Sequence, residues 1–225
     1  MLNISVIVNT VAVIIGSILG LLGGRLLKDR YRKVFFNVIG ILTMGLGIEM
    51  FLDTNSVLVV LGSLIIGGAL GEALDIEEKI GRLAGNKHDD ENFVKGFITA
   101  SVLFVAGPMT VIGSLKAGLS GENELIFIKS LMDGISSMML SAALGKGVLL
   151  SAAAVYLVQG GLVSLAGVLS FLQDPLYLGD FSGVGGLMLL ALGIRLLEIK
   201  EIRVGNFLPA LILSPVLTWV SLLFT

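Results

Sequence analysis

The stretch VIGILTMGLGIEMF (Val38–Phe51) has a counterpart later in the chain, VGGLMLLALGIRLL (Val184–Leu197). Identical residues recur 146 positions apart at Val38/Val184, Gly40/Gly186, Leu46/Leu192, Gly47/Gly193 and Ile48/Ile194. The next pair sets Glu49 against Arg195, an acid against a base. Two apolar stretches with one shared pattern predict two related helices, and the reversed charge at their ends needs an explanation.

Composition places these helices in a membrane. The chain has 225 residues, of which 55% are hydrophobic and 14% charged, and its mean hydropathy is +0.99. A soluble domain is about 25% charged, so we expect an integral membrane protein. The absence of cysteine excludes disulfides, thiol catalysis and Cys-ligated metals. No enzyme motif, cofactor motif or basic nucleic-acid-binding module is present, so we expect neither an enzyme nor a nucleic-acid-binding protein.

The apolar parts of the sequence form eight segments, each long enough to cross the hydrocarbon core of a membrane. They cover about residues 3–24, 34–51, 57–74, 93–113, 126–144, 147–170, 181–197 and 205–224. All are expected to be helical, because a backbone in lipid has no other hydrogen-bond partner unless a barrel closes. The predicted fold class is therefore an all-α membrane protein with about eight transmembrane helices in a single polytopic domain over residues 1–225.

The distribution of lysine and arginine predicts the orientation of the chain in the membrane. Alternating crossings put thirteen of the fifteen basic residues on one side, and only Lys116 and Lys129 on the other. The basic side is expected to be cytoplasmic. Both termini are then predicted to lie outside the cytoplasm.

The repeat extends beyond the two opening stretches. GSILGLLGG (Gly16–Gly24) resembles GGLVSLAGV (Gly160–Val168), and Ser63 and Ser214 occupy similar places in the third and eighth spans. Repeat one (about 3–74) and repeat two (about 147–224) enter the membrane from opposite sides, with linking helices at about 93–144. An inverted repeat explains the opening pair: Glu49 ends its helix outside and Arg195 ends its helix inside. Chance alignment of text rich in Gly and Leu is the alternative.

Small residues spaced four apart predict close helix contacts. Such stripes are Gly16, Gly20 and Gly24; Ser63, Gly67 and Gly71; and Ser137, Ser141 and Gly145. Bundle packing or a homo-oligomer would both use them. Asp133 lies four residues before Ser137, on the same stripe, so it is expected to face protein and to suit a proton or cation path. The alternative is an acid near the outer end of its helix, paired with Lys129 four residues earlier.

The text FVAGPMTVIGS contains Gly107-Pro108 in the middle of a predicted span. Proline removes a backbone donor and obstructs the preceding turn, so the helix is expected to break there and expose backbone groups along a path. A simple kink is the alternative. Asn9, Gln159 and Asn206 are the remaining candidate polar lining residues. Interhelical bonding is the alternative for each, and Asn206 could cap the first turn of its own helix.

Three segments carry a resemblance to a known family: FITASVLFVAGPMTVIGSL, KSLMDGISSMMLSAALGKGVLLSA and LGIRLLEIKEIRVGNFLPALILSPV. They resemble the YdfK/YqgA-type family of bacterial integral membrane proteins, a domain of unknown function, over essentially the whole chain. The resemblance implies a protein of the bacterial cytoplasmic membrane. It implies no substrate and no binding residue.

The function that these patterns favour is a small secondary transporter or channel for an ion or small polar solute. Inverted three-helix repeats are typical of many secondary transporters, whose site lies near the midplane where the repeats meet. The candidate path residues are Asp133, Gly107, Pro108, Asn9, Ser137, Gln159 and Asn206, with no metal and no cofactor. The expected partners are the lipid bilayer and the solute. The alternative is a non-transporting scaffold or regulator that binds other membrane proteins through its glycine stripes.

Overall fold

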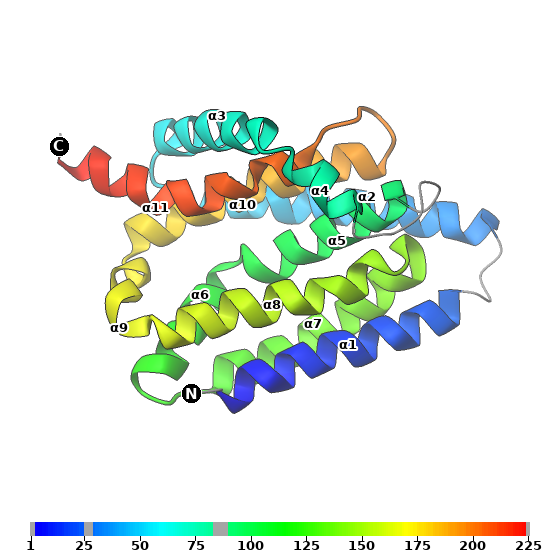
Figure 1. The fold of residues 1–225 in the computed structure, drawn as a ribbon, viewed down its shortest axis with the longest axis horizontal. Coiled ribbons are helices and arrows are strands. Elements are labelled where there is room, and N and C mark those ends of the chain that lie inside the picture. The colour runs from blue at the N-terminus through cyan, green and yellow to red at the C-terminus, as the bar shows by residue number, and fades with distance from the viewer. Residues whose placement is uncertain (1–2, 25–28, 83–89, 224–225) are drawn as a thin grey trace. The chain divides into compact units, whose positions relative to one another are not determined.

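The computed structural model describes residues 3–24, 29–82 and 90–223, and every regular element in these ranges is a helix (Figure 1). The elements are α1 (Ile4–Gly24), α2 (Asp29–Leu52), α3 (Val57–Ala73), α4 (Ile76–Arg82), α5 (Asp90–Val105), α6 (Pro108–Leu119), α7 (Glu124–Leu144), α8 (Gly147–Ser164), α9 (Ala166–Leu169), η1 (Ser170–Gln173), α10 (Pro175–Leu196), η2 (Val204–Phe207) and α11 (Leu208–Leu222). The all-helical class predicted from the sequence is confirmed.

Within the described ranges, five helices are long and apolar enough to cross a membrane, or up to seven if each of two bent pairs is one span. The bent pairs are α3 with α4, at 50°, and α5 with α6, at 58°. The apolar part of α2, Phe36–Leu52, is a shorter helix. Each of the eight predicted spans thus overlaps one or more helices, and the one at 93–113 covers the bent pair of α5 and α6, but the count of eight crossings stays a prediction.

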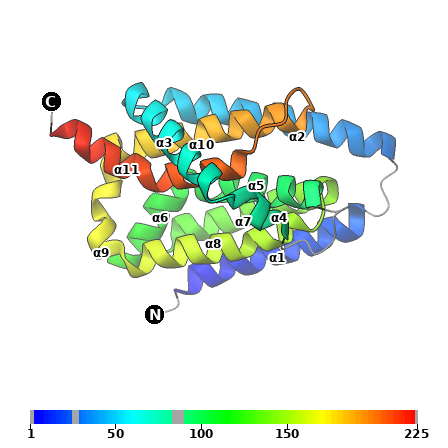
Figure 2. The same cartoon turned by 45° about the horizontal axis from the view of Figure 1, so that its top comes forward.

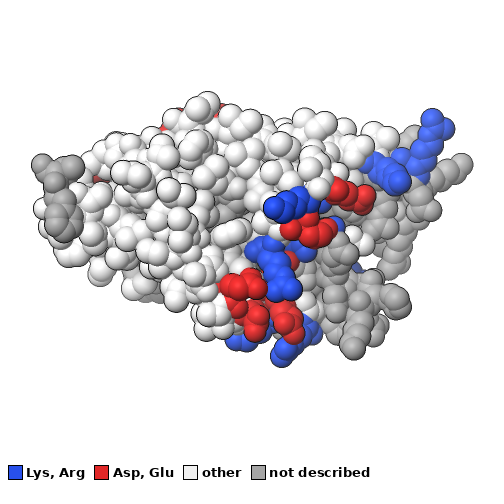
Figure 3. Space-filling view, turned by 90° about the horizontal axis from the view of Figure 1, so that it is seen from above, with Lys and Arg blue, Asp and Glu red and all other residues white. Residues whose placement is uncertain are grey.

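The surface of the helices agrees with a lipid environment. Large apolar side chains are exposed on the surface; Leu58, for example, is 79% exposed and Ile212 is 77% exposed. Figure 3 shows one face on which charged side chains gather in one region, while most of the remaining visible surface carries no charge. In water such a surface would aggregate, whereas lipid tails are as apolar as these side chains.

Several predicted boundaries differ from the structure by up to six residues, and two of them are instructive. The span predicted at 147–170 ends at Ser164 and is followed by α9 and η1. The span predicted to begin at residue 181 begins at Pro175. The side chain of Asp174 accepts a hydrogen bond from the Leu176 amide at 2.9 Å, with proline in the first turn behind it. Asp at the N-cap followed by Pro is a strong signal for a helix start. The residues between Pro175 and the predicted start at residue 181 therefore form the first turns of α10.

The chain folds into two compact units, each assembled from two separate stretches of sequence. Unit 1 comprises residues 1–36 and 91–171, and unit 2 comprises residues 37–90 and 172–225. Unit 1 therefore contains α1 from the first predicted repeat and α8 from the second, together with the linking helices. Unit 2 contains α2 and α3 from the first repeat and α10 and α11 from the second. The predicted repeats do not coincide with the units.

In unit 1, α1 and α7 run side by side (Figures 1 and 2). A Cβ on Gly16 would collide with the carbonyl oxygen of Gly134, and one on Gly20 with that of Met138. Residue numbers rise together along both helices, so α1 and α7 are parallel. The glycine stripe of α1 thus meets the serine stripe of α7, and close approach is possible because neither stripe carries a large side chain.

In unit 2, α2 packs against α10 in the antiparallel sense. A Cβ on Gly47 would lie 2.6 Å from the carbonyl oxygen of Gly186, and one on Gly186 would lie 2.6 Å from the carbonyl oxygen of Gly47. Further along, a Cβ on Gly193 would lie 2.8 Å from the carbonyl oxygen of Gly40. The glycines that define the sequence repeat are therefore contact residues, and their backbones approach each other directly.

Candidate functional site

A buried polar cluster joins three helices of unit 1. Asp133 on α7 is 4% exposed and accepts two hydrogen bonds from the Lys129 ammonium, at 2.8 Å to Oδ1 and 2.9 Å to Oδ2. Asn9 on α1 donates its Nδ2 to Asp133 Oδ2 at 3.1 Å and to Gln159 Oε1 on α8 at 3.1 Å. We call Lys129, Asp133, Asn9 and Gln159 the polar cluster. Its hydrogen bonds form one continuous chain from α7 through α1 to α8.

Helical spacing puts these residues together. On α7 the buried face includes Lys129, Asp133 and Ser137, each four residues after the last. On α1 the buried face includes Asn9 and, seven residues later, Gly16. Since residues three, four and seven apart share one side of a helix, the small residues that bring α1 and α7 together also bring their polar residues together.

The predicted break in the fourth span lies beside this cluster. α5 ends at Val105 and α6 begins at Pro108, with Gly107 in an extended conformation between them. The last carbonyls of a helix lack amide partners, and here the carbonyl of Phe104 accepts instead from the Thr110 hydroxyl at 2.6 Å. The Lys129 ammonium lies 5.9 Å from the centre of the Phe104 ring. Lys129 thus connects the last turn before the break to Asp133.

Two atoms of the polar cluster have no hydrogen-bond partner: Oδ1 of Asn9 and Nε2 of Gln159. Both residues are completely buried. Exchanging the oxygen and nitrogen of Asn9 would point a carbonyl oxygen at the Asp133 carboxylate, so the amide nitrogen must face Asp133. Asn9 in turn fixes Gln159. Leaving a buried amide group unpaired costs about 1–3 kcal/mol, so the cluster contains one unused acceptor and one unused donor.

An open cavity of about 570 Å³ follows the same seam between α1 and α8. Its lining includes Asn3 and Val6 from α1 and the preceding segment, and Tyr156 and Gly160 from α8. Val6 lies one turn before Asn9, and Gly160 follows Gln159 directly. Neither Asn9 nor Gln159 is among the residues that line this cavity.

The structure brings together most of the residues predicted to line a path. Asp133, Asn9 and Gln159 are bonded in one cluster. The predicted alternative for Asp133, an ion pair with Lys129, also forms. Asp133 therefore both faces protein and pairs with Lys129. Ser137 lies one turn further along α7, where its hydroxyl donates to the Gly134 carbonyl at 2.9 Å.

Asn206 lies in unit 2 and does not cap the first turn of its own helix. Its Oδ1 accepts from the Glu77 amide at 2.9 Å, and its Nδ2 donates to the Glu72 carboxylate at 2.6 Å. The amide therefore caps α4, a helix that the sequence interpretation had placed in a hydrophilic loop. The reason is distance along the chain, since the two partners are more than 120 residues apart.

Unit 2 holds buried charges that sequence reasoning missed. Arg195 donates to Glu77 Oε1 at 2.7 Å, and both side chains are less than 9% exposed. Asp180 on α10 is completely buried and accepts from the Ser56 amide at 2.7 Å and the Thr218 hydroxyl at 2.9 Å. Asp180 is therefore a second buried acid inside a candidate span, in addition to Asp133. The Asp174-Pro175 start signal would have placed Asp180 inside its helix.

The site contains no feature of a metal centre. Across the described parts of the chain, no group of three or more His, Cys, Asp and Glu is arranged to hold a metal ion.

Comparison with known proteins gives relatives over nearly the full length. The chain is 30% identical over 218 residues to the "Uncharacterized membrane protein YdfK" of Bacillus subtilis (strain 168), covering 95% of each chain. It is 29% identical over 217 residues to the "Uncharacterized protein YqgA" of Escherichia coli (strain K12), covering 92% of each. No solved structure matches. A family model matches residues 4–219, so the chain belongs to the family described as "Protein of unknown function (DUF554)".

Proposed function

We propose that this membrane protein is a small secondary transporter or channel that carries an ion or small polar solute across the bacterial cytoplasmic membrane. The observation that carries the proposal is the polar cluster of unit 1. Charged and amide groups inside a membrane bundle are expensive and face a partner or a cavity. Packing alone needs no buried charge, and further along α1 and α7 Gly16 and Gly20 meet the partner helix without one.

The glycine contacts of unit 2 support the inverted repeat on which this proposal also draws. The spacing of 146 positions equates Gly40 with Gly186 and Gly47 with Gly193. In space, Gly47 meets Gly186 and Gly40 meets Gly193. A two-fold axis between two antiparallel helices produces this exchange, because each residue then meets the equivalent of its partner. Such an axis runs in the membrane plane, as expected for alternating access between two inverted copies.

The uneven distribution of basic residues supports our placement of both termini outside the cytoplasm. The B. subtilis relative, whose name calls it a membrane protein, supports a membrane location. The bilayer and the cargo are the partners we propose, and no enzymatic step is part of the function.

A non-transporting scaffold is the second candidate function, and its main support is the set of glycine stripes. Gly16, Gly20 and Gly24 are already covered by α7 within unit 1. Gly67 and Gly71 are likewise covered by α11 and η2 within unit 2. Stripes that are used inside the chain are not free to bind other membrane proteins, which favours the transporter.

The test compares a buried with an exposed ion pair in proteoliposomes. The buried variants are Asp133→Asn, Lys129→Met and both together. Each single variant leaves an uncompensated buried partner, and we expect a loss of about 3–5 kcal/mol in unfolding free energy, with partial recovery in the double variant. The matched control is Lys116→Met with Glu122→Gln, a pair whose side chains are 45% and 61% exposed.

Flux is measured for protons, Na⁺, K⁺, water, urea and acetamide. We expect at least one probe to cross faster than in protein-free liposomes, and this flux to fall at least tenfold in the single variants but not in the control. A double variant that folds and transports would show that the pair only needs to be neutral, whereas a folded, inactive one would show that transport requires the charged groups themselves. Wild-type protein that moves no probe would contradict the transport function.

A further inference from the structure

We infer, on the basis of the transport function proposed above, that the cargo is a small uncharged solute with both a hydrogen-bond donor and an acceptor, held by the free Asn9 and Gln159 amide atoms. Water, urea and simple amides belong to this class. The inference rests on three properties of the polar cluster: its charge balance, the use of its charged atoms, and the identity of its free atoms.

The ion pair in the cluster is electrically neutral. Lys129 contributes one positive charge and Asp133 one negative charge, at a separation of 2.8 Å. Both side chains are less than 9% exposed. A bare ion placed beside this pair would add a net charge to a buried region, and the cost of desolvating it would have no opposite charge to offset it. An uncharged solute avoids that cost.

The charged atoms are occupied by one another. Asp133 Oδ1 accepts from Lys129, and Oδ2 accepts from both Lys129 and Asn9. The Lys129 ammonium gives two hydrogen bonds to this carboxylate and lies 5.9 Å from the centre of the Phe104 ring. A cargo cation could reach the carboxylate only by displacing the tethered ammonium. The pair therefore orients Asn9 rather than binding an ion.

The free atoms are one acceptor and one donor. Asn9 and Gln159 are already joined by a 3.1 Å hydrogen bond, and each has one unused group, the Asn9 carbonyl oxygen and the Gln159 amino group. A donor and an acceptor on neighbouring amides complement a solute that offers the same two groups in return. An open cavity lies between the same two helices and is lined by Val6 and Gly160, while Asn9 and Gln159 themselves are completely buried.

The experiment measures uncharged and charged probes on the same proteoliposomes. Stopped-flow light scattering follows water, urea and acetamide, and current recordings on a supported membrane follow jumps in Na⁺, K⁺ and Cl⁻. Gln159→Met is the test variant, because methionine keeps the length of the side chain and removes both polar atoms. Gln173→Met is the matched control at the other glutamine of the chain, which lies in η1.

We expect at least one uncharged probe to cross membranes that contain the wild-type protein, and we expect no ion current. The flux of that probe should fall tenfold or more with Gln159→Met and should not change with Gln173→Met. An unchanged melting temperature of Gln159→Met would show that the loss is not unfolding. An ion current that Gln159→Met removes would overturn the inference and leave the transport function standing. Uncharged flux that is indifferent to Gln159 would overturn the site, and silence of all probes would overturn both proposals.

Discussion

Among the residues that the structure describes, both units contain an ion pair with two buried side chains, and these two pairs are built differently. In unit 1, Lys129 and Asp133 are four residues apart on one helix. In unit 2, Arg195 and Glu77 are 118 residues apart and come from α10 and α4. The first pair ties no distant segments together, whereas the second joins two separate parts of the chain.

The surroundings of the two carboxylates differ in the same way. Glu77 uses both of its oxygens for structure: Oε1 accepts from Arg195, and Oε2 accepts from the Gly205 amide at 2.8 Å. Its own amide is capped by Asn206. Asp133 instead leads through Asn9 to Gln159, where a donor and an acceptor are left over. A buried ion pair whose polar neighbours all have hydrogen-bond partners has a structural role. A pair whose neighbours include atoms without partners marks a candidate site.

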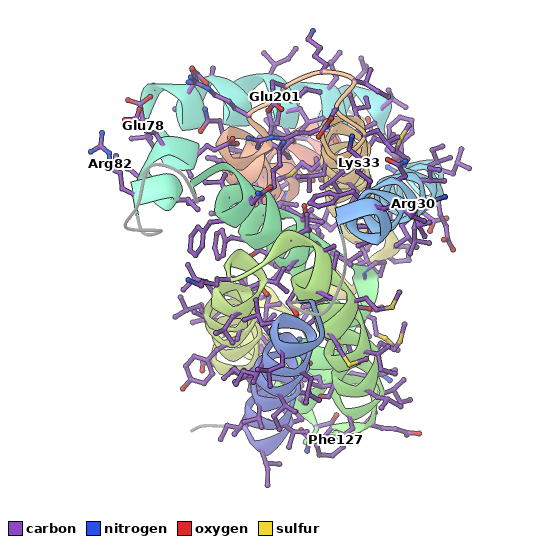
Figure 4. All side chains as sticks on the ribbon, turned by 90° about the vertical axis from the view of Figure 1, so that its right-hand side faces the viewer. Arg30, Lys33, Glu78, Arg82, Phe127 and Glu201 are labelled. Carbon is purple, nitrogen blue, oxygen red and sulfur yellow. The ribbon has the colours of Figure 1, made fainter. Side chains whose placement is uncertain are left out.

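The largest expected effect on stability comes from breaking the buried Arg195–Glu77 ion pair of unit 2. Glu77→Ala removes the buried carboxylate that accepts from Arg195 and from the Gly205 amide, and leaves Arg195 with the more exposed Glu201 carboxylate, so we expect a loss of up to about 3–5 kcal/mol in unfolding free energy. Chemical unfolding in detergent measures it. The control is the next residue, Glu78→Ala, whose exposed pair with Arg82 points away from α4 (Figure 4) and should leave the unfolding midpoint unchanged. Equal effects would mean that the buried pair does not have a structural role.

An intermediate effect should come from the glycine contacts. Gly47→Ala and Gly186→Ala each place a methyl group against the other's backbone, and overpacking of this kind costs about 1–3 kcal/mol. Because the contacts are reciprocal, the two losses should be similar. Gly45→Ala on the same helix meets nothing within 4 Å, and should be neutral or slightly stabilising. Clearly unequal losses at Gly47 and Gly186 would argue against a two-fold axis.

The smallest expected effect is on stability at Gln159. Gln159→Met removes one hydrogen bond with Asn9 and also one unsatisfied buried nitrogen. The two terms oppose each other, so the unfolding free energy should change by less than about 1 kcal/mol. A much larger loss in thermal or chemical unfolding would place Gln159 with Glu77 among the structural residues, and the distinction between the two units would disappear.

Much of the site could be predicted from local text. Asp133 shares a helix face with Ser137, and the structure buries both. The Gly107-Pro108 break forms where proline removes a donor. Glu77 and Asp180 were missed because each lies outside the predicted spans, while the residues that pair with them, Arg195 and Thr218, lie elsewhere in the chain.

The sequence by itself determined that this is a helical membrane protein, where most of its long helices lie, where the fourth span breaks and which helix faces carry small residues. These properties follow from composition, proline and the period of the helix, all of which act within a few residues. The tertiary structure alone decided that the stripe of α1 meets α7, that Asn9 joins Asp133 to Gln159, and that Arg195 finds Glu77. Several helices offer similar stripes, and lipid is as apolar as their side chains. The choice of partner therefore depends on shape and on polar groups that only the folded chain brings together.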